Sequence, residues 1–236
     1  MSIATEITRL QNDSAAIAAA IAAKGVTVPS GSGFDDYATL VGQISGGQPT
    51  PYTSKIEYLQ TDGTQFFFMQ VDGSEATDAF YVDFQQTTNK NQARIICPIV
   101  SSTNAACQLY VNGSGKVAYS FNGSWMGTNT AVGTTRHAVT LDYANKKITV
   151  DGEDTTISGS STKNTGTVCL GAVGKYGSNA TFIGKIWRLK MWRSGTLIHD
   201  WEPVRVGNIG YMYDNVTGDM IGNAGAGSFT LGPDVS

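Results

Sequence analysis

Short runs of alternating side chains constrain this chain more than any other feature. The run FYVDFQ at residues 80–85 places Phe80, Val82 and Phe84 on one face of an extended chain, which is the period of a half-buried β-strand. Asn112-Gly113 divides residues 108–121 into one hairpin, and a second hairpin is predicted over 137–152. Roughly a dozen such strands with no intervening helices predict a two-sheet antiparallel sandwich or jelly roll.

The first residues differ from the rest. MSIATEITRLQNDSAAIAAAIAAKG is rich in alanine, and its apolar residues recur at steps of four and three, which is a heptad seam with Ser14 as one polar layer. Isoleucine at both seam positions favours three-stranded coils. We therefore expect a homotrimeric coiled coil whose seam contains Ile3, Ile7, Leu10, Ser14, Ile17 and Ile21. The alternative is one amphipathic helix packed on its own β-domain.

Composition suggests where the domains meet. A second short helix is predicted with an apolar side of Phe34, Tyr37, Leu40, Val41 and Ile44. The Gly- and Pro-containing stretch that follows is typical of a linker. The expected organisation is a helical attachment and trimerisation segment at 1–45, a linker at 46–54 and a β-domain at 55–236.

Two resemblances add to this interpretation. The heptad helix followed by KGVTVPSGSGFDDYATLVGQI resembles the N-terminal segments of bacteriophage tail and receptor-binding proteins over residues 1–45. That resemblance implies that the segment trimerises the chain and attaches it to other virion proteins.

Three segments of the β-domain carry the second resemblance. IEYLQTDGTQFF, FIGKIWRLKMWRSGTLIHDWEPVR and GYMYDNVTGDMIGNAGAGSFTLGP occur in this order, with a last pair of strands expected at 211–214 and 228–232. Their order is similar to that in the concanavalin A-like lectin/glucanase (LamG-like) jelly roll of phage tail and gut-bacterial surface proteins. The resemblance covers residues 55–233 and implies a mainly β jelly-roll sandwich, a fold that hosts lectins, hydrolases and passive spacers.

Charge and cysteine content exclude several classes of protein. A net charge of −3 offers no electrostatic footprint for nucleic acid. Three cysteines without a Cys-x-x-Cys motif argue against a disulfide framework and a zinc cluster, and we interpret them as small buried hydrophobes. Neither a signal peptide nor an apolar run of membrane-spanning length is visible. We expect a virion protein made in the host bacterial cytoplasm, without membrane insertion.

The sequence predicts no catalytic residue, metal or cofactor. Hydrolases of the resembled fold use a Glu-x-Asp-x-x-Glu spacing that this chain lacks. His199 adjoins Asp200, but neighbouring strand residues point to opposite faces and cannot form a catalytic pair. The run from Asp214 to Asp219 lacks the ligand spacing of an EF-hand. We expect that the protein is not an enzyme.

Two places offer the aromatic and polar side chains that sugar sites use. One is a Gly-flanked loop with Asn122 and Trp125. The other is IWRLKMW, where Arg188, Lys190 and Trp192 share one strand face and suit an acidic or phosphorylated glycan. Alternatively, Trp192 caps the edge of the core and the two cations are solvated. Trp187 and Trp201 are expected in the core.

The expected function is a phage virion appendage of the tail-fibre or receptor-binding type, displaying a lectin-like domain that adheres to host surface glycans. Two alternatives remain open at this point. One is a head fibre or capsid decoration protein without a ligand, and the other is a glycan hydrolase.

Overall fold

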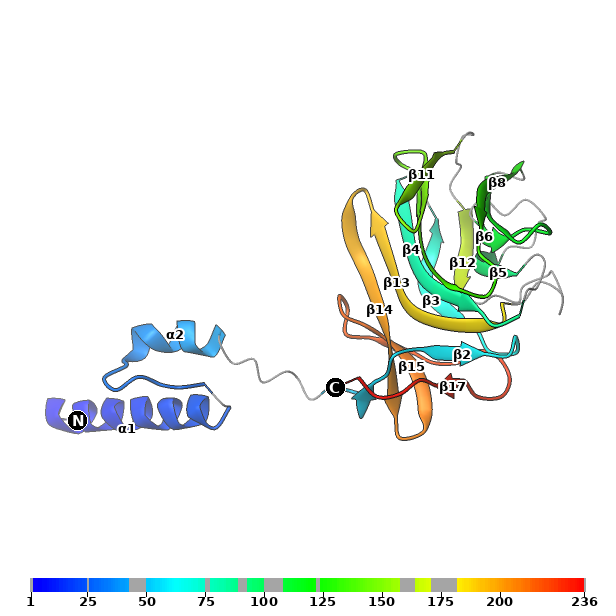
Figure 1. The fold of residues 1–236 in the computed structure, drawn as a ribbon. Helices are drawn as coiled ribbons and strands as arrows, with labels where there is room; N and C mark the ends of the chain where they lie inside the picture. The colour runs from blue at the N-terminus through cyan, green and yellow to red at the C-terminus, as the bar shows by residue number, and fades with distance from the viewer. Residues whose placement is uncertain are drawn as a thin grey trace. The chain divides into compact units, whose positions relative to one another are not determined.

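The computed structural model describes residues 2–24, 26–42, 50–74, 77–88, 93–99, 108–121, 124–157, 164–170 and 182–235. The chain divides into two compact units, Met1–Pro51 and Tyr52–Ser236, here called the N-terminal unit and the β-domain. The N-terminal unit holds helices α1 (Ile3–Ala22) and α2 (Phe34–Gly42). The described strands all belong to the β-domain, which is a mainly antiparallel jelly-roll sandwich of two sheets (Figure 1).

The larger sheet has a central path of eight strands. In spatial order they are β11 (Glu153–Thr156), β10 (Lys147–Val150), β9 (Arg136–Asp142), β4 (Asp78–Gln86), β13 (Gly184–Arg193), β14 (Thr196–Val206), β15 (Ile209–Asp214) and β16 (Met220–Ile221). Three short strands join it: β1 (Ser54–Lys55) pairs with β14, β2 (Leu59–Thr61) pairs with β13, and β17 (Thr230–Leu231) pairs with β2.

The smaller sheet contains the remaining described strands. Their spatial order is β3 (Phe67–Ser74), β12 (Asn164–Leu170), β5 (Arg94–Ile99), β6 (Gln108–Val111), β7 (Lys116–Phe121) and β8 (Ser124–Ala131). The predicted hairpin at 108–121 is β6–β7, and the one at 137–152 is β9–β10. Both form because their turns and their alternation are local features.

The core lies between the two sheets. Strand β4 alternates buried and half-buried positions along its whole length, so Phe80, Val82 and Phe84 face inward. They join one hydrophobic cluster with Phe67 and Met69 of the opposite sheet. Each large buried side chain of this kind contributes about 1.5–3 kcal/mol of transfer free energy. The outward positions of the same strands are therefore the ones free to serve a function.

The two strands predicted at 211–214 and 228–232 are present as β15 and β17, but they do not pair with each other. Instead, β17 pairs with β2 through Leu231 opposite Leu59. The connecting loop crosses to β2 because the amide of Ala226 donates to the carbonyl of Thr64 at 3.0 Å. Gly225 permits this approach, since a Cβ there would lie 2.0 Å from the Thr64 carbonyl oxygen.

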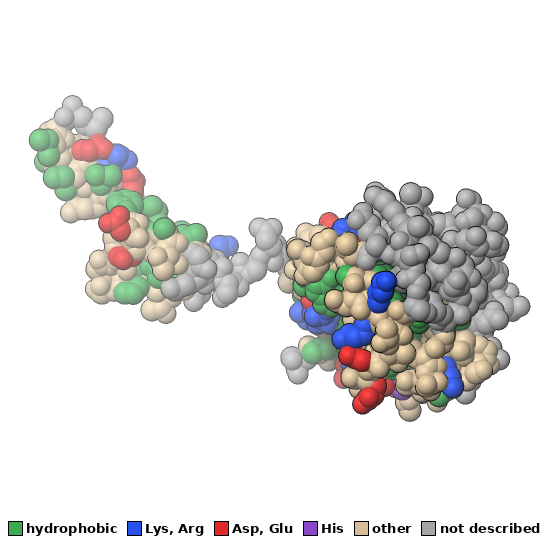
Figure 2. Space-filling view, turned by 90° about the horizontal axis from the view of Figure 1, so that it is seen from above, with side chains coloured by type: hydrophobic (Ala, Val, Ile, Leu, Met, Phe, Trp, Pro, Cys, Tyr) green, Lys and Arg blue, Asp and Glu red, His purple; other side chains and the backbone are tan. Residues whose placement is uncertain are grey.

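The N-terminal unit is a helical hairpin with a small core of its own. Ile21, Val26, Tyr37 and Leu40 form a buried cluster between α1 and α2. Figure 2 shows hydrophobic side chains gathered on the surface of this unit. Among the described helices, none is long and apolar enough to cross a membrane.

Candidate functional site

Three neighbouring strands bring Trp192, Ala79 and Asp142 into one row on the outer face of the larger sheet. Trp192 of β13 is opposite Ala79 of β4, and Ala79 is in turn opposite Asp142 of β9. None of the three is buried, whereas the adjacent residues Met191, Phe80 and Leu141 are buried in the core. Two strand spacings separate the backbones of Trp192 and Asp142 by about 9–10 Å, and the methyl group of Ala79 leaves the space between them open.

A cleft of about 280 Å³ occupies this position. Its lining combines the three residues of the row with turn residues at the same end of the sheet: Thr77, Ala79, Thr140, Asp142, Ala144, Asn145, Trp192 and Gly195. One aromatic ring, a small apolar floor and several short polar side chains therefore converge on one opening. This combination is typical of small-ligand sites, which are mostly apolar with a few placed polar groups.

The polar wall of the cleft is preorganised by a turn. Asp142 accepts hydrogen bonds from the Asn145 backbone amide at 2.9 Å and from the Asn145 side-chain amide at 2.8 Å. This Asx-type arrangement fixes both side chains at the end of β9. A carboxylate has about four acceptor sites, so Asp142 keeps acceptor capacity for a hydroxyl in the cleft.

The cations that the sequence grouped with Trp192 are engaged elsewhere. Arg188 donates two hydrogen bonds to Asp200, at 2.8 and 2.7 Å, and lies 3.7 Å from Glu202. Lys190 lies 3.6 Å from Asp200. The hydrogen bond to Asp200 raises the pKa of the Arg188 guanidinium above its ordinary value. Arg188, Lys190 and Trp192 do share the outer face, but only Trp192 lines the cleft.

The other predicted glycan site cannot be assembled from the described residues. Asn122 lies outside them. Trp125 belongs to β8 of the smaller sheet, and its side chain is likewise outside the description. The cleft residues stand on the larger sheet, so the structure does not unite the two predicted places.

Trp187 does not lie in the core as predicted. The register between β13 and β4 shifts between Ile186 and Arg188, so a β-bulge sends Trp187 outward. Its ring lies 5.4 Å from that of Tyr58, and the guanidinium of Arg136 lies 4.3 Å above it. Strict alternation fails here because the extra residue of the bulge reverses which face of the sheet the preceding residues of β13 occupy.

Trp201 is buried as predicted, and the ring of His199 stacks on it at 4.4 Å. His199 does not pair with Asp200 but with Asp214, at 2.6 Å across the strand pair. Burial raises the pKa of Asp214, yet hydrogen bonds from the Asp200 amide, His199 and the Val216 amide outweigh it and leave the pKa lowered. The hydrogen bonds of Asp214 therefore hold the turn after β15 in place. Separately, no group of three His, Cys, Asp or Glu side chains that could bind a metal occurs among the described residues.

The structure divides the predicted heptad seam between two environments. Ser14 and Ile21 face α2 of the same chain: the Ser14 hydroxyl lies 2.8 Å from the Tyr37 hydroxyl, and Ile21 is buried. The other seam residues stay exposed, with exposed fractions of 82% for Ile3, 50% for Ile7, 42% for Leu10 and 38% for Ile17. Phe34 and Val41 of α2 are exposed too, whereas Ile44 lies outside the described residues.

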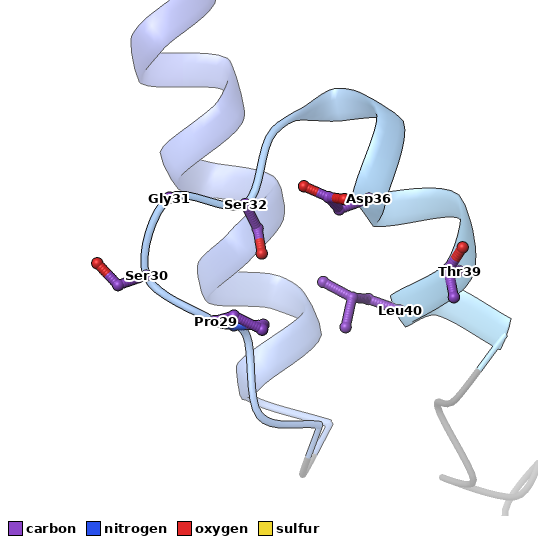
Figure 3. Close-up of a pocket in the computed structure, with 7 residues that line it drawn as sticks. All are labelled: Pro29, Ser30, Gly31, Ser32, Asp36, Thr39 and Leu40. Atoms are coloured by element: carbon purple, nitrogen blue, oxygen red, sulfur yellow. The ribbon is translucent and has the colours of Figure 1, made fainter.

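A second hollow, of about 350 Å³, lies within the N-terminal unit. Figure 3 shows Leu40 pointing from α2 toward the loop Pro29–Ser32 across it. Asp36 accepts a hydrogen bond from the Gly33 amide at 2.9 Å, so its carboxylate serves the start of α2. The described residues that line this hollow include no aromatic side chain, in contrast to Trp192 in the β-domain cleft.

Comparison with known proteins yields structural likeness only. No protein-family model matches the sequence, and no curated protein matches it. A putative carbohydrate binding protein from Bacteroides ovatus aligns at a TM-score of 0.49 and 13% identity, over 75% of this chain and 60% of that one. The SAP-like pentraxin of Limulus polyphemus gives 0.45 and 14%, over 61% and 78%. Chicken galectin 2 gives 0.34 and 11%, over 55% and 98%.

With TM-scores below 0.5, these likenesses carry no argument about this chain. The chain spans 60% of the length of the Bacteroides protein. The jelly-roll assignment rests on the antiparallel strand order described above, and the chemistry of the site rests on the cleft itself.

Proposed function

We propose that this chain is a bacteriophage virion appendage of the tail-fibre or receptor-binding type, whose β-domain adheres to a glycan on the host surface. The observation that carries the adhesive part is the cleft between Trp192 and Asp142. The virion part rests on the resemblance of residues 1–45 to phage attachment segments. The proposal assigns no catalysis, cofactor or metal, and it places synthesis in the host cytoplasm.

The cleft suits a sugar ring for three physical reasons. The apolar face of a pyranose stacks on an aromatic ring, and Trp192 offers one. Planar acceptors and donors match vicinal hydroxyls, and Asp142 with Asn145 supplies them in a fixed arrangement. The small side chain of Ala79 leaves room for the ring between the two walls.

Charge favours an uncharged sugar. Arg188 and Lys190 both contact Asp200, and Lys55 contacts Glu202 at 2.6 Å. Neither Arg188 nor Lys190 lines the cleft. Asp142 adds a negative charge at the cleft itself. An acidic or phosphorylated glycan in the cleft would meet the carboxylate of Asp142 without direct contact to Arg188 or Lys190. We therefore propose a neutral glycan as the ligand.

The test measures binding of the full chain to host cells and to neutral and acidic polysaccharides by surface plasmon resonance. Trp192→Ala and the cleft-filling Ala79→Leu are expected to weaken neutral-glycan binding by about tenfold or more, equivalent to about 1.4 kcal/mol. Trp187→Ala is the matched control, because it removes a tryptophan from the same strand outside the cleft. Equal losses in all three variants would reject the cleft.

Other outcomes point to the alternatives. Wild-type chain that is incorporated into virions but binds no glycan would support the non-binding head fibre or decoration protein. Release of shorter saccharides from the polysaccharide would support a hydrolase.

The N-terminal unit is proposed to assemble the chain into a homotrimer and to hold it on other virion proteins. Its own core is small, and an exposed stripe of Ile3, Ile7, Leu10 and Ile17 remains for partners. Trimerisation would raise avidity through effective concentration. Light scattering of the full chain and of residues 52–236 tests this: we expect a trimer and a monomer, and a monomeric full chain would remove the proposed assembly.

A further inference from the structure

Two of the three cysteines occupy directly opposite positions in the smaller sheet. Strands β12 and β5 are antiparallel, and their register pairs Cys169 with Cys97. The register is regular over four consecutive residue pairs, without a bulge. Both strands have a neighbour on their other side, β3 and β6 respectively, so these backbone positions lie inside the sheet.

Directly opposite residues of a ladder belong to the same face of their sheet, so the register gives both cysteine positions one face. The adjoining pair, Leu170 and Ile96, is buried in the core. On the other side of β12, Cys169 is opposite Phe68, whose exposed fraction is 40%.

The spacing of opposite residues suits a disulfide. Opposite Cα atoms in an antiparallel ladder are about 4.5 or 5.5 Å apart, depending on whether the pair is hydrogen-bonded. Disulfides span Cα separations of about 4.4–6.8 Å. Either kind of pair therefore falls within the Cα separations that disulfides span.

We propose that Cys97 and Cys169 are an oxidisable pair that forms an intrachain disulfide once the chain leaves a reducing environment. With a small disulfide as oxidant, one thiolate attacks it and releases the first small thiol. The second cysteine thiolate then attacks the mixed disulfide and releases the second. The two cysteine thiols are oxidised, the small disulfide is reduced to two thiols, and atoms and electrons balance.

This bond would join β5 to β12 across a long stretch of intervening chain. A cross-link of that kind stabilises mainly by restricting the unfolded chain. The inference goes beyond the proposed function and stands without it, because it rests on the strand register alone. The odd number of cysteines did not predict this pair, because a count does not show which two cysteines are opposite each other in a sheet.

The test incubates the folded full chain with oxidised glutathione, then alkylates it in denaturant with N-ethylmaleimide and maps the peptides by mass spectrometry. We expect Cys97 and Cys169 in one linked peptide pair and Cys107 alkylated. Cys107→Ser, the matched control, should keep the link, whereas Cys97→Ser and Cys169→Ser should lose it. Oxidised wild type and oxidised Cys107→Ser should melt several degrees higher than their reduced forms.

Three results would overturn the inference: alkylation of all three cysteines after oxidation, a stable glutathione adduct on Cys97 or Cys169, or a link that includes Cys107. Each is distinct from the glycan assays, so failure here leaves the proposed adhesion untouched, and the reverse also holds.

Discussion

The N-terminal unit and the β-domain bury apolar surface on very different scales. The helical hairpin has four buried hydrophobic side chains among its described residues, while one much larger cluster in the β-domain contains residues of both sheets. The hairpin leaves Ile3, Ile7, Leu10 and Ile17 exposed. Small units rarely bury enough surface to be stable alone. The β-domain therefore has much the larger core, and the small core of the hairpin agrees with the proposal that this unit assembles with partners.

The largest expected effect is on the stability that the core gives the β-domain. Phe84 is fully buried and packs edge-on against Phe182. Phe84→Ala should lower the free energy of unfolding by about 3–5 kcal/mol, because it leaves a cavity. Urea denaturation followed by tryptophan fluorescence measures this. Phe34→Ala, which removes an exposed phenylalanine of α2, is the control and should change the free energy of unfolding by less than about 0.5 kcal/mol. Similar losses in the two variants would contradict the prediction.

A smaller effect concerns polar groups buried in the β-domain. Asp214→Asn keeps the shape but replaces an acceptor-only carboxylate that holds His199 and two backbone amides. We expect a loss of about 1–3 kcal/mol, measured by the same denaturation at neutral pH. Its effect should exceed that of any exposed carboxylate.

The same residue predicts a pH dependence. The pKa of Asp214 is lower in the folded chain than its ordinary value of 3.8. The unfolded chain therefore binds this proton first, so the stabilisation is fully present above about pH 4 and is lost as pH falls through the folded pKa. Between pH 5 and pH 2.5, wild type should lose more stability than Asp214→Asn, and parallel curves would contradict the assignment.

A lesser effect is expected within the hairpin. The Tyr37 hydroxyl contacts the Ser14 hydroxyl at 2.8 Å and donates to its carbonyl at 3.0 Å. Tyr37→Phe should loosen α2 by about 0.5–1.5 kcal/mol, seen as faster amide hydrogen exchange in α2 of the full chain. Tyr211→Phe, in the β-domain, should leave exchange in α2 unchanged. Protection that persists in Tyr37→Phe would mean that apolar packing alone holds the hairpin.

The smallest effect concerns the outer face of the larger sheet. Lys190 is half-exposed and approaches Asp200 only to 3.6 Å. Lys190→Ala should cost less than about 0.5 kcal/mol, whereas Arg188→Ala removes two hydrogen bonds to the same carboxylate and should cost more. Thermal melts at low and high salt compare the two variants. A reversed order would show that Lys190 has a partner beyond Asp200.

Sequence patterns predicted the local features well and the distant ones poorly. The Asn112-Gly113 turn and the alternation around Phe84 are properties of a few adjacent residues, and both hairpins formed as predicted. Trp192 lies on the outer face, as its alternation with Met191 indicated. Trp187 was misplaced, because a bulge is set by the neighbouring strand.

The cleft shows the same limit. Trp192 was identified from its strand, but its partners Ala79 and Asp142 were missed, since they come from strands far away in the sequence. The turn Asp142–Asn145 carried a usable signal, because Asp and Asn at that spacing favour an Asx turn at a strand end. Only the strand order β9–β4–β13 brings that turn to the tryptophan.

By itself, the sequence determined the class of the fold, the faces of most strands and the existence of a separate helical segment, because those follow from periodicities of two and of about three and a half residues. The tertiary structure decided which residues meet. It turned Ser14 and Ile21 toward α2, paired His199 with Asp214, and set Cys97 opposite Cys169. Such pairings depend on strand register and chain closure, which many distant contacts fix together and no single segment encodes.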